Sequence, residues 1–137
     1  MWDNRKKDDM KRPVTIILYG VLIWLIPFLA GFPFVDATGT FLIPETFFKS
    51  IMVVIGAFVG VLLAVRYFST INAGQIKEGI IIGMSWFAIN LALDLLMVFV
   101  GFFPMTILQY ITEIGLRYVS IPIYTVGLGI ALERQQK

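Results

Sequence analysis

The chain has 137 residues, of which 58% are hydrophobic and only 15% charged, and its formal net charge is +2 at pH 7. A soluble domain carries about 25% charged residues, so this composition indicates a protein that resides in a bilayer. The sequence contains no cysteine and no histidine, which excludes disulfides, thiolate or imidazole metal sites and histidine general-base catalysis.

Four apolar stretches follow one another along the chain. A helix rises ~1.5 Å per residue and the hydrocarbon core of a bilayer is ~30 Å thick, so about 20 residues are needed to cross it. The stretches have about that length and cover Val14–Phe32, Phe47–Val65, Gly79–Val100 and Leu116–Leu132. They predict an all-α fold, an antiparallel four-helix transmembrane bundle, with residues 1–137 forming a single domain.

Lysine and arginine are distributed unevenly between the segments that connect these stretches. Nine of the eleven lie in the N-terminal arm (residues 1–13), in the connection between the second and third stretches, and in the tail (residues 133–137). Only Lys49 and Arg117 lie on the opposite side. Because cytoplasmic segments are enriched in Lys and Arg, we expect both termini in the cytoplasm and a multi-pass protein of the inner cell membrane. Topology thus explains the basic charge, and we expect no nucleic-acid partner.

The first apolar stretch is expected to be a retained helix. It is too long for the apolar region of a signal peptide, it contains Trp24 and Pro27, and no small-x-small cleavage site follows it. It therefore counts as the first membrane span.

The segment between the third and fourth stretches carries helix signals of its own. Pro104 suits the first turn of a helix, and Thr106–Gly115 is amphipathic. This segment is either a short interfacial helix before the fourth span or the outer end of one long fourth helix, which Pro122 would kink. Tyr110 and Tyr118 are assigned to an interfacial aromatic belt without a functional role.

The third stretch contains an embedded carboxylate, Asp94. Counted from Glu78, it lies ~24 Å along its helix, and Arg117, counted back from Glu133, lies at a similar height on the fourth helix. An unpaired charge in a bilayer costs several kcal/mol. We therefore expect a salt bridge between Asp94 and Arg117, with Lys49 as a competing partner for the carboxylate.

Helical spacing places further polar side chains beside this pair. On the third helix Gly83, Trp86 or Phe87, Asn90 and Asp94 share one face. The resulting polar strip, open to the outside, is predicted to contain Asp94, Arg117, Asn90, Tyr124, Lys49 and Glu113. It is either a crevice for a solute or ion, or a buried pair that sets the helix register, with Asn90 and Tyr124 as hydrogen-bonding partners. The architectural interpretation is preferred.

Small residues at four-residue spacing recur on three of the spans, and such stripes let helices approach closely in lipid. They are Gly56, Gly60 and Ala64 on the second span, Gly79 and Gly83 on the third, and Gly127 and Ala131 on the fourth. For the third and fourth spans we expect packing within the chain. The stripe of three on the second span predicts a homo-oligomer.

Three segments carry a resemblance to other proteins: residues 83–86 (GMSW), 90–96 (NLALDLL) and 114–122 (IGLRYVSIP). With them, the third and fourth spans resemble those of small uncharacterised prokaryotic four-helix integral membrane proteins. The resemblance implies a four-span fold and a prokaryotic source. It implies no activity.

Three classes of function follow from these patterns. The small-residue stripes and the lack of a catalytic or cofactor motif favour a non-enzymatic accessory or structural subunit. Such a subunit packs with itself or with other membrane proteins. The polar strip and the prolines favour a small-solute or ion transporter or channel working as a homo-oligomer. A lone embedded carboxylate without a metal ligand or nucleophile–base pair argues against an enzyme. We expect the accessory role, with no cofactor, no metal site and no catalytic residue.

Overall fold

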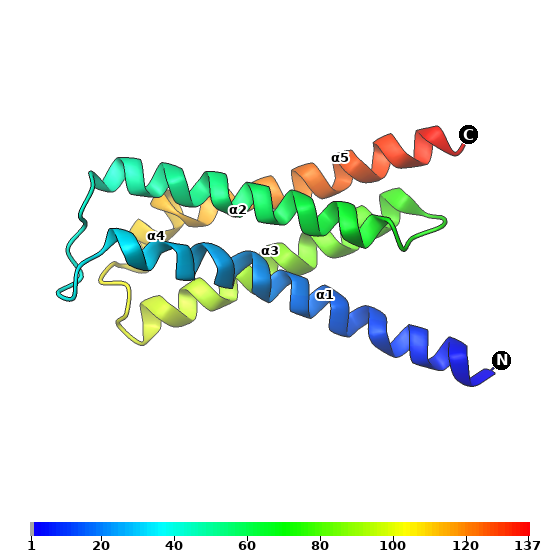
Figure 1. The fold of residues 1–137 in the computed structure, drawn as a ribbon, viewed down its shortest axis with the longest axis horizontal. Coiled ribbons are helices and arrows are strands. Elements are labelled where there is room, and N and C mark those ends of the chain that lie inside the picture. The colour runs from blue at the N-terminus through cyan, green and yellow to red at the C-terminus, as the bar shows by residue number, and fades with distance from the viewer. Residues whose placement is uncertain (1) are drawn as a thin grey trace.

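The structure, a computed structural model, describes residues 2–137, with side chains described from Met10 onward. The described part is helical and contains no β-strand (Figure 1). Its elements, in chain order, are α1 (Trp2–Gly31), the short 3₁₀ helix η1 (Phe32–Phe34), α2 (Glu45–Phe68), α3 (Gln75–Phe99), α4 (Ile107–Glu113), the 3₁₀ helix η2 (Gly115–Val119) and α5 (Ser120–Gln135).

Four helical segments are long and apolar enough to cross a membrane. They are Met10–Phe34, Glu45–Phe68, Gln75–Phe99 and Gly115–Gln135, which confirms the predicted all-α fold with four candidate spans. Large apolar side chains lie on the outside of the helices, as at Val54 (67% exposed) and Phe58 (65% exposed) on α2. Soluble monomers rarely expose such continuous apolar surface, whereas a multi-pass membrane protein requires it.

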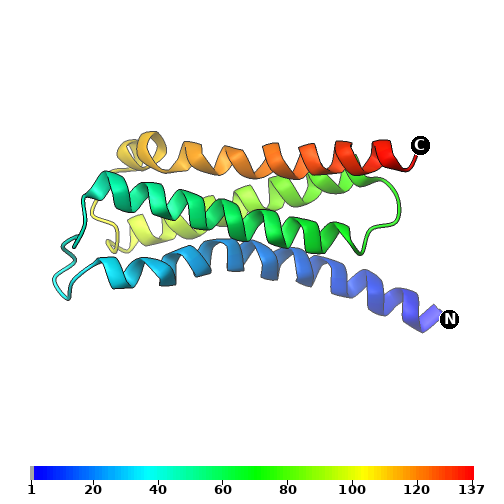
Figure 2. The same ribbon diagram turned by 45° about the horizontal axis from the view of Figure 1, so that its top comes forward.

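Helix α3 is the centre of the packing. It contacts α5 most extensively and α1 next, while α2 packs against α1 and more loosely against α5. Figures 1 and 2 show both chain termini and the α2–α3 connection at one end of the molecule, which we call the terminal end. The α1–α2 connection and α4 lie at the other end, which we call the loop end.

The two connections around α3 follow from local chemistry. At the terminal end Gly74 adopts φ +70°, a left-handed conformation that glycine tolerates, and α3 begins at the next residue. At the loop end Thr106 caps α4, and its hydroxyl and the Gln109 side chain form a reciprocal capping box. Of the two alternatives for this segment, the separate short helix is confirmed, because α4 ends at Glu113 before η2 and α5 follow.

Glycines bring α3 and α5 into backbone contact. A Cβ at Gly79 would lie 2.5 Å from the backbone oxygen of Thr125, and one at Gly83 would overlap the Thr125 side chain. The Thr125 hydroxyl donates to the carbonyl oxygen of Gly79 at 2.9 Å. On the other side of the contact, a Cβ at Gly129 would lie 2.5 Å from the backbone oxygen of Gln75. The prediction that Gly79 and Gly83 pack within the chain is confirmed.

The corresponding prediction for Gly127 and Ala131 is wrong. Gly127 has open space around its Cβ position, and both residues are exposed. Successive helix residues are rotated by about 100°, so Gly127 and Gly129 point in nearly opposite directions and only one of them can face α3. Thr125 and Gly129 occupy the packed face instead.

The small residues of α2 are used inside the chain. A Cβ at Gly60 would overlap the hydroxyl of Tyr124 on α5, and Ala64 is fully buried. Gly56 faces Pro27 of α1, whose side chain lies 3.8 Å from its Cβ position. The stripe that motivated the homo-oligomer prediction therefore has an intrachain partner, and the oligomer itself stays a prediction.

Candidate functional site

The carboxylate of Asp94 is the centre of a buried polar cluster near the loop end. Asp94 is 4% exposed. The Trp24 indole donates to its Oδ1 at 2.6 Å, while the Tyr110 and Tyr118 hydroxyls donate to its Oδ2 at 3.0 and 2.6 Å. These donors come from α1, α4 and η2. A buried carboxylate needs such hydrogen bonds to offset its lost hydration, and here neutral donors supply all of them.

The predicted salt bridge between Asp94 and Arg117 is wrong. Arg117 is exposed, and its side chain hydrogen-bonds to the backbone oxygen of Lys49, 3.5 Å from its Nη1. The physical reason is the helix face. Thr125 and Gly129 form the side of α5 that packs against α3. At about 100° per residue, Tyr118 falls on the side of Thr125, whereas Arg117 falls about 80° away from it.

Lys49, the competing candidate, also pairs elsewhere. Its Nζ lies 2.7 Å from Glu45 and 2.8 Å from Glu113, so it joins α2 to α4 at the loop end. The hydrogen bond from Lys49 holds the pKa of Glu113 below its usual value. Among the described side chains, no cation lies within salt-bridge distance of Asp94.

Asn90 lies one turn from Asp94 and fastens α3 to α1. It is fully buried, and its amide donates to the backbone oxygens of Gly20 at 3.1 Å and Trp86 at 2.8 Å. Trp86, also fully buried, donates to the Ile16 backbone oxygen at 2.9 Å. The predicted shared face of α3 is confirmed, with Trp86 rather than Phe87 on it. Asn90 nevertheless donates to the backbone of α1 and does not support an Asp94–Arg117 pair.

A cavity of about 130 Å³ adjoins the cluster, between α1, α2 and the η2–α5 segment. Trp24, Tyr118 and Tyr124 line it together with Arg117 and Ser120, and the rest of its wall is apolar. The hydroxyl of Tyr124 is buried without a hydrogen-bond partner. At about 30 Å³ per water, the cavity has room for a few waters or one small solute. Asp94 is absent from its wall, because Trp24 and Tyr118 stand between.

The predicted polar strip is therefore divided into three parts. Asp94 and Asn90 lie in the interior, while Lys49 and Glu113 pair at the loop end. Arg117 and Tyr124 line the cavity. The six residues form no single crevice.

Sequence reasoning missed the three donors to Asp94. Tyr110 and Tyr118 were assigned to the aromatic belt, and Trp24 only marked the first span. One signal pointed to them: an embedded carboxylate must be satisfied, and Tyr and Trp are long neutral donors at a suitable depth. Their convergence on one carboxylate depends on contacts 16 to 70 residues apart in the chain.

A second buried cluster, at the terminal end, was also missed. Glu78 on α3 is 7% exposed and forms an ion pair with Arg12 of α1. The Tyr67 hydroxyl donates to Glu78 Oε2 at 2.7 Å and accepts from Arg12 Nε at 3.2 Å. These three residues, the Arg12–Tyr67–Glu78 cluster, join α1, α2 and α3.

The two clusters contain Glu78 and Asp94, the buried carboxylates of the described side chains. From Met10 onward, no group of three or more His, Asp or Glu side chains is placed to hold a metal ion. No family model, curated protein or solved structure matches the chain.

Proposed function

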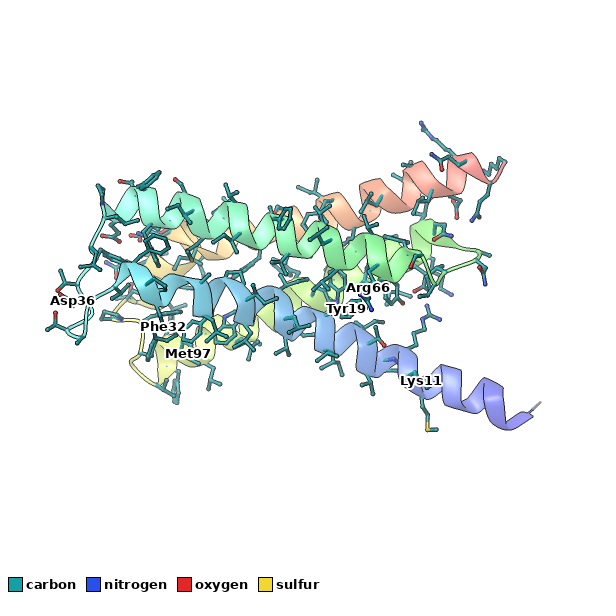
Figure 3. All side chains as sticks on the ribbon, in the orientation of Figure 1. Lys11, Tyr19, Phe32, Asp36, Arg66 and Met97 are labelled. Carbon is teal, nitrogen blue, oxygen red and sulfur yellow. The ribbon has the colours of Figure 1, made fainter. Side chains whose placement is uncertain are left out.

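We propose that the protein crosses the membrane four times as an antiparallel bundle, with its terminal end in the cytoplasm. The support is the excess of Lys and Arg in the segments of that end. Lys11 and Arg66 lie towards it, whereas Asp36 lies at the loop end (Figure 3). Both termini are then cytoplasmic, and the inner cell membrane of a prokaryote is the proposed location.

We propose that the protein is a non-enzymatic accessory or structural subunit, which packs with itself or with another membrane protein. The observation that carries this proposal is that three neutral donors hydrogen-bond to Asp94 and engage both of its oxygens. A carboxylate that binds a substrate or relays a proton must exchange partners. Here Trp24 and the two tyrosines already occupy both oxygens, and they tie α1, α4 and η2 to α3. The embedded charge then serves the fold.

The proposed contact surface is the lipid-facing side of α5. Gly127 and Ala131 are exposed there at four-residue spacing, beside the exposed Ile123 and Ile130. Small residues on a lipid-facing helix allow a second helix to approach closely, and van der Waals packing then drives association. Unlike the stripe on α2, this exposed stripe does not pack against another helix of the chain.

Native mass spectrometry of the full chain released from lipid discs tests this role. We expect a complex with a second copy or with another membrane protein, and Ala131→Leu should shift most of it to the single chain, because a larger side chain separates the helices. Ala92→Leu makes the same change at an exposed position of α3 and should leave the complex intact. A wild-type chain that is always found alone, or two variants that behave alike, would contradict the proposal.

One observation favours a transporter or channel as a second candidate. Arg117 lines the cavity of about 130 Å³, and its guanidinium suits a small anion. In that case Arg117→Gln should abolish anion flux into vesicles containing the purified protein, without changing its thermal stability. Flux that is the same with Arg117→Gln as with the wild type, or no flux above protein-free vesicles, would rule this function out.

A further inference from the structure

A groove at the terminal end lies between α1 and α3, beside the Arg12–Tyr67–Glu78 cluster. Its volume is about 380 Å³, and it is lined by Arg12, Pro13 and Ile16 of α1 and by Lys77, Glu78 and Ile81 of α3. Arg12, Pro13, Lys77 and Ile81 are exposed. The groove therefore opens to the surroundings of the protein.

Charge and apolar surface are separated along the groove. Arg12 and Lys77 lie on the terminal-end side of the groove, whereas Ile16 and Ile81 each lie one helical turn, about 6 Å, further into the span. In the proposed four-span topology, on which this inference rests, the cationic groups lie at the depth of lipid headgroups and the isoleucines at the depth where acyl chains begin. This order matches an amphiphile with an anionic head.

The acidic residue of the groove is already neutralised. Glu78 binds Arg12 through Oε1 and the Tyr67 hydroxyl through Oε2. Arg12 uses its Nε and one Nη in these contacts, and a guanidinium carries five N–H donors, so others remain for an anion. Lys77 is exposed and makes no hydrogen bond or ion pair with any described side chain. Among the described residues that line it, the groove keeps one positive charge in excess.

We propose that this groove binds an anionic phospholipid of the leaflet at the terminal end. Lys77 and the unused donors of Arg12 hold the phosphate, and one acyl chain lies over Ile16 and Ile81. Basic pockets between transmembrane helices on the cytoplasmic side recognise anionic headgroups in this way. The site does not depend on the accessory role, because it uses neither Asp94 nor the exposed face of α5.

Thermal unfolding of the detergent-purified full chain tests this site. Phosphatidylglycerol should raise the Tm above the value in phosphatidylcholine of the same chain length, because only the former carries a net negative charge. Lys77→Gln should weaken the apparent affinity for phosphatidylglycerol about fivefold, since a cation near an anionic headgroup contributes about 1 kcal/mol. Lys137→Gln removes the same charge at the same end, outside the groove, and should keep the wild-type response.

Soluble glycerol phosphate separates a lipid from a free anion, and we expect it to leave the Tm unchanged. The lipid site would be overturned if glycerol phosphate reproduced the shift, or if both lipids stabilised the protein equally. Equal loss of the response in Lys77→Gln and Lys137→Gln would also overturn it, because the effect would then reflect net charge and not the groove.

Discussion

Replacing Asp94 by alanine is expected to lower the free energy of unfolding by about 3–5 kcal/mol, the range found when one partner of a buried charged network is removed. The change leaves the Trp24 indole and the Tyr110 and Tyr118 hydroxyls without their acceptor. Each buried donor that loses its partner costs about 1–3 kcal/mol, and relief from burying the carboxylate offsets part of that sum. Unfolding in mixed micelles, followed by circular dichroism, measures the difference.

Arg117 supplies the control for this prediction. Arg117→Gln should change the free energy of unfolding by less than about 0.5 kcal/mol, as for most exposed substitutions. The double variant Asp94→Asn with Arg117→Gln should be no more stable than Asp94→Asn alone. Recovery in the double variant would show that the two residues pair, and an Asp94→Ala protein as stable as the wild type would show that the cluster is not structural.

Replacing Arg12 by glutamine is the second change with a large expected effect. It leaves the Glu78 side chain, which is 9% exposed, with Tyr67 as its remaining partner. Losing one member of a fully buried pair costs about 3–5 kcal/mol, but the Arg12 side chain is 45% exposed, so we expect about 1–3 kcal/mol. The same mixed-micelle unfolding measures it.

The Arg12–Tyr67–Glu78 cluster also predicts a rescue. Adding Glu78→Gln to Arg12→Gln removes the unpaired buried charge and should restore part of the lost stability. Arg66→Gln, at an exposed position of α2 towards the same end, should have little effect. If Arg66→Gln destabilised the protein as much as Arg12→Gln did, the loss would come from net charge and not from this ion pair.

Helix α3 and the fourth span show where the 3.6-residue period predicts the buried face of a helix and where it does not. On α3 the buried positions Gly83, Trp86, Asn90 and Asp94 follow the 3.6-residue period of one regular helix, and they could be predicted. The same procedure failed on the fourth span, because the predicted polar strip ran through Arg117 and Tyr124, whereas Thr125 and Gly129 face α3. Tyr118 shares the side of Thr125 and reaches Asp94, and Arg117 does not.

The glycines of the fourth span show a second limit of prediction from sequence spacing. The fourth span contains Gly127 and Gly129, and four-residue spacing pointed to Gly127 with Ala131. The choice of Gly129 depends on where the Gln75 backbone of α3 lies. That position is a property of the neighbouring helix, so no pattern within α5 contains it.

By itself the amino-acid sequence determined that the chain forms four apolar helices of membrane-spanning length. The reason is that hydropathy and helix length are sums over consecutive residues and need no knowledge of neighbours. Only the tertiary structure decided which groups satisfy Asp94 and Glu78. Their partners lie 11 to 70 residues away in the chain, and hydrogen bonds require distances that only the packed arrangement of α1, α2, α3, α4 and η2 provides.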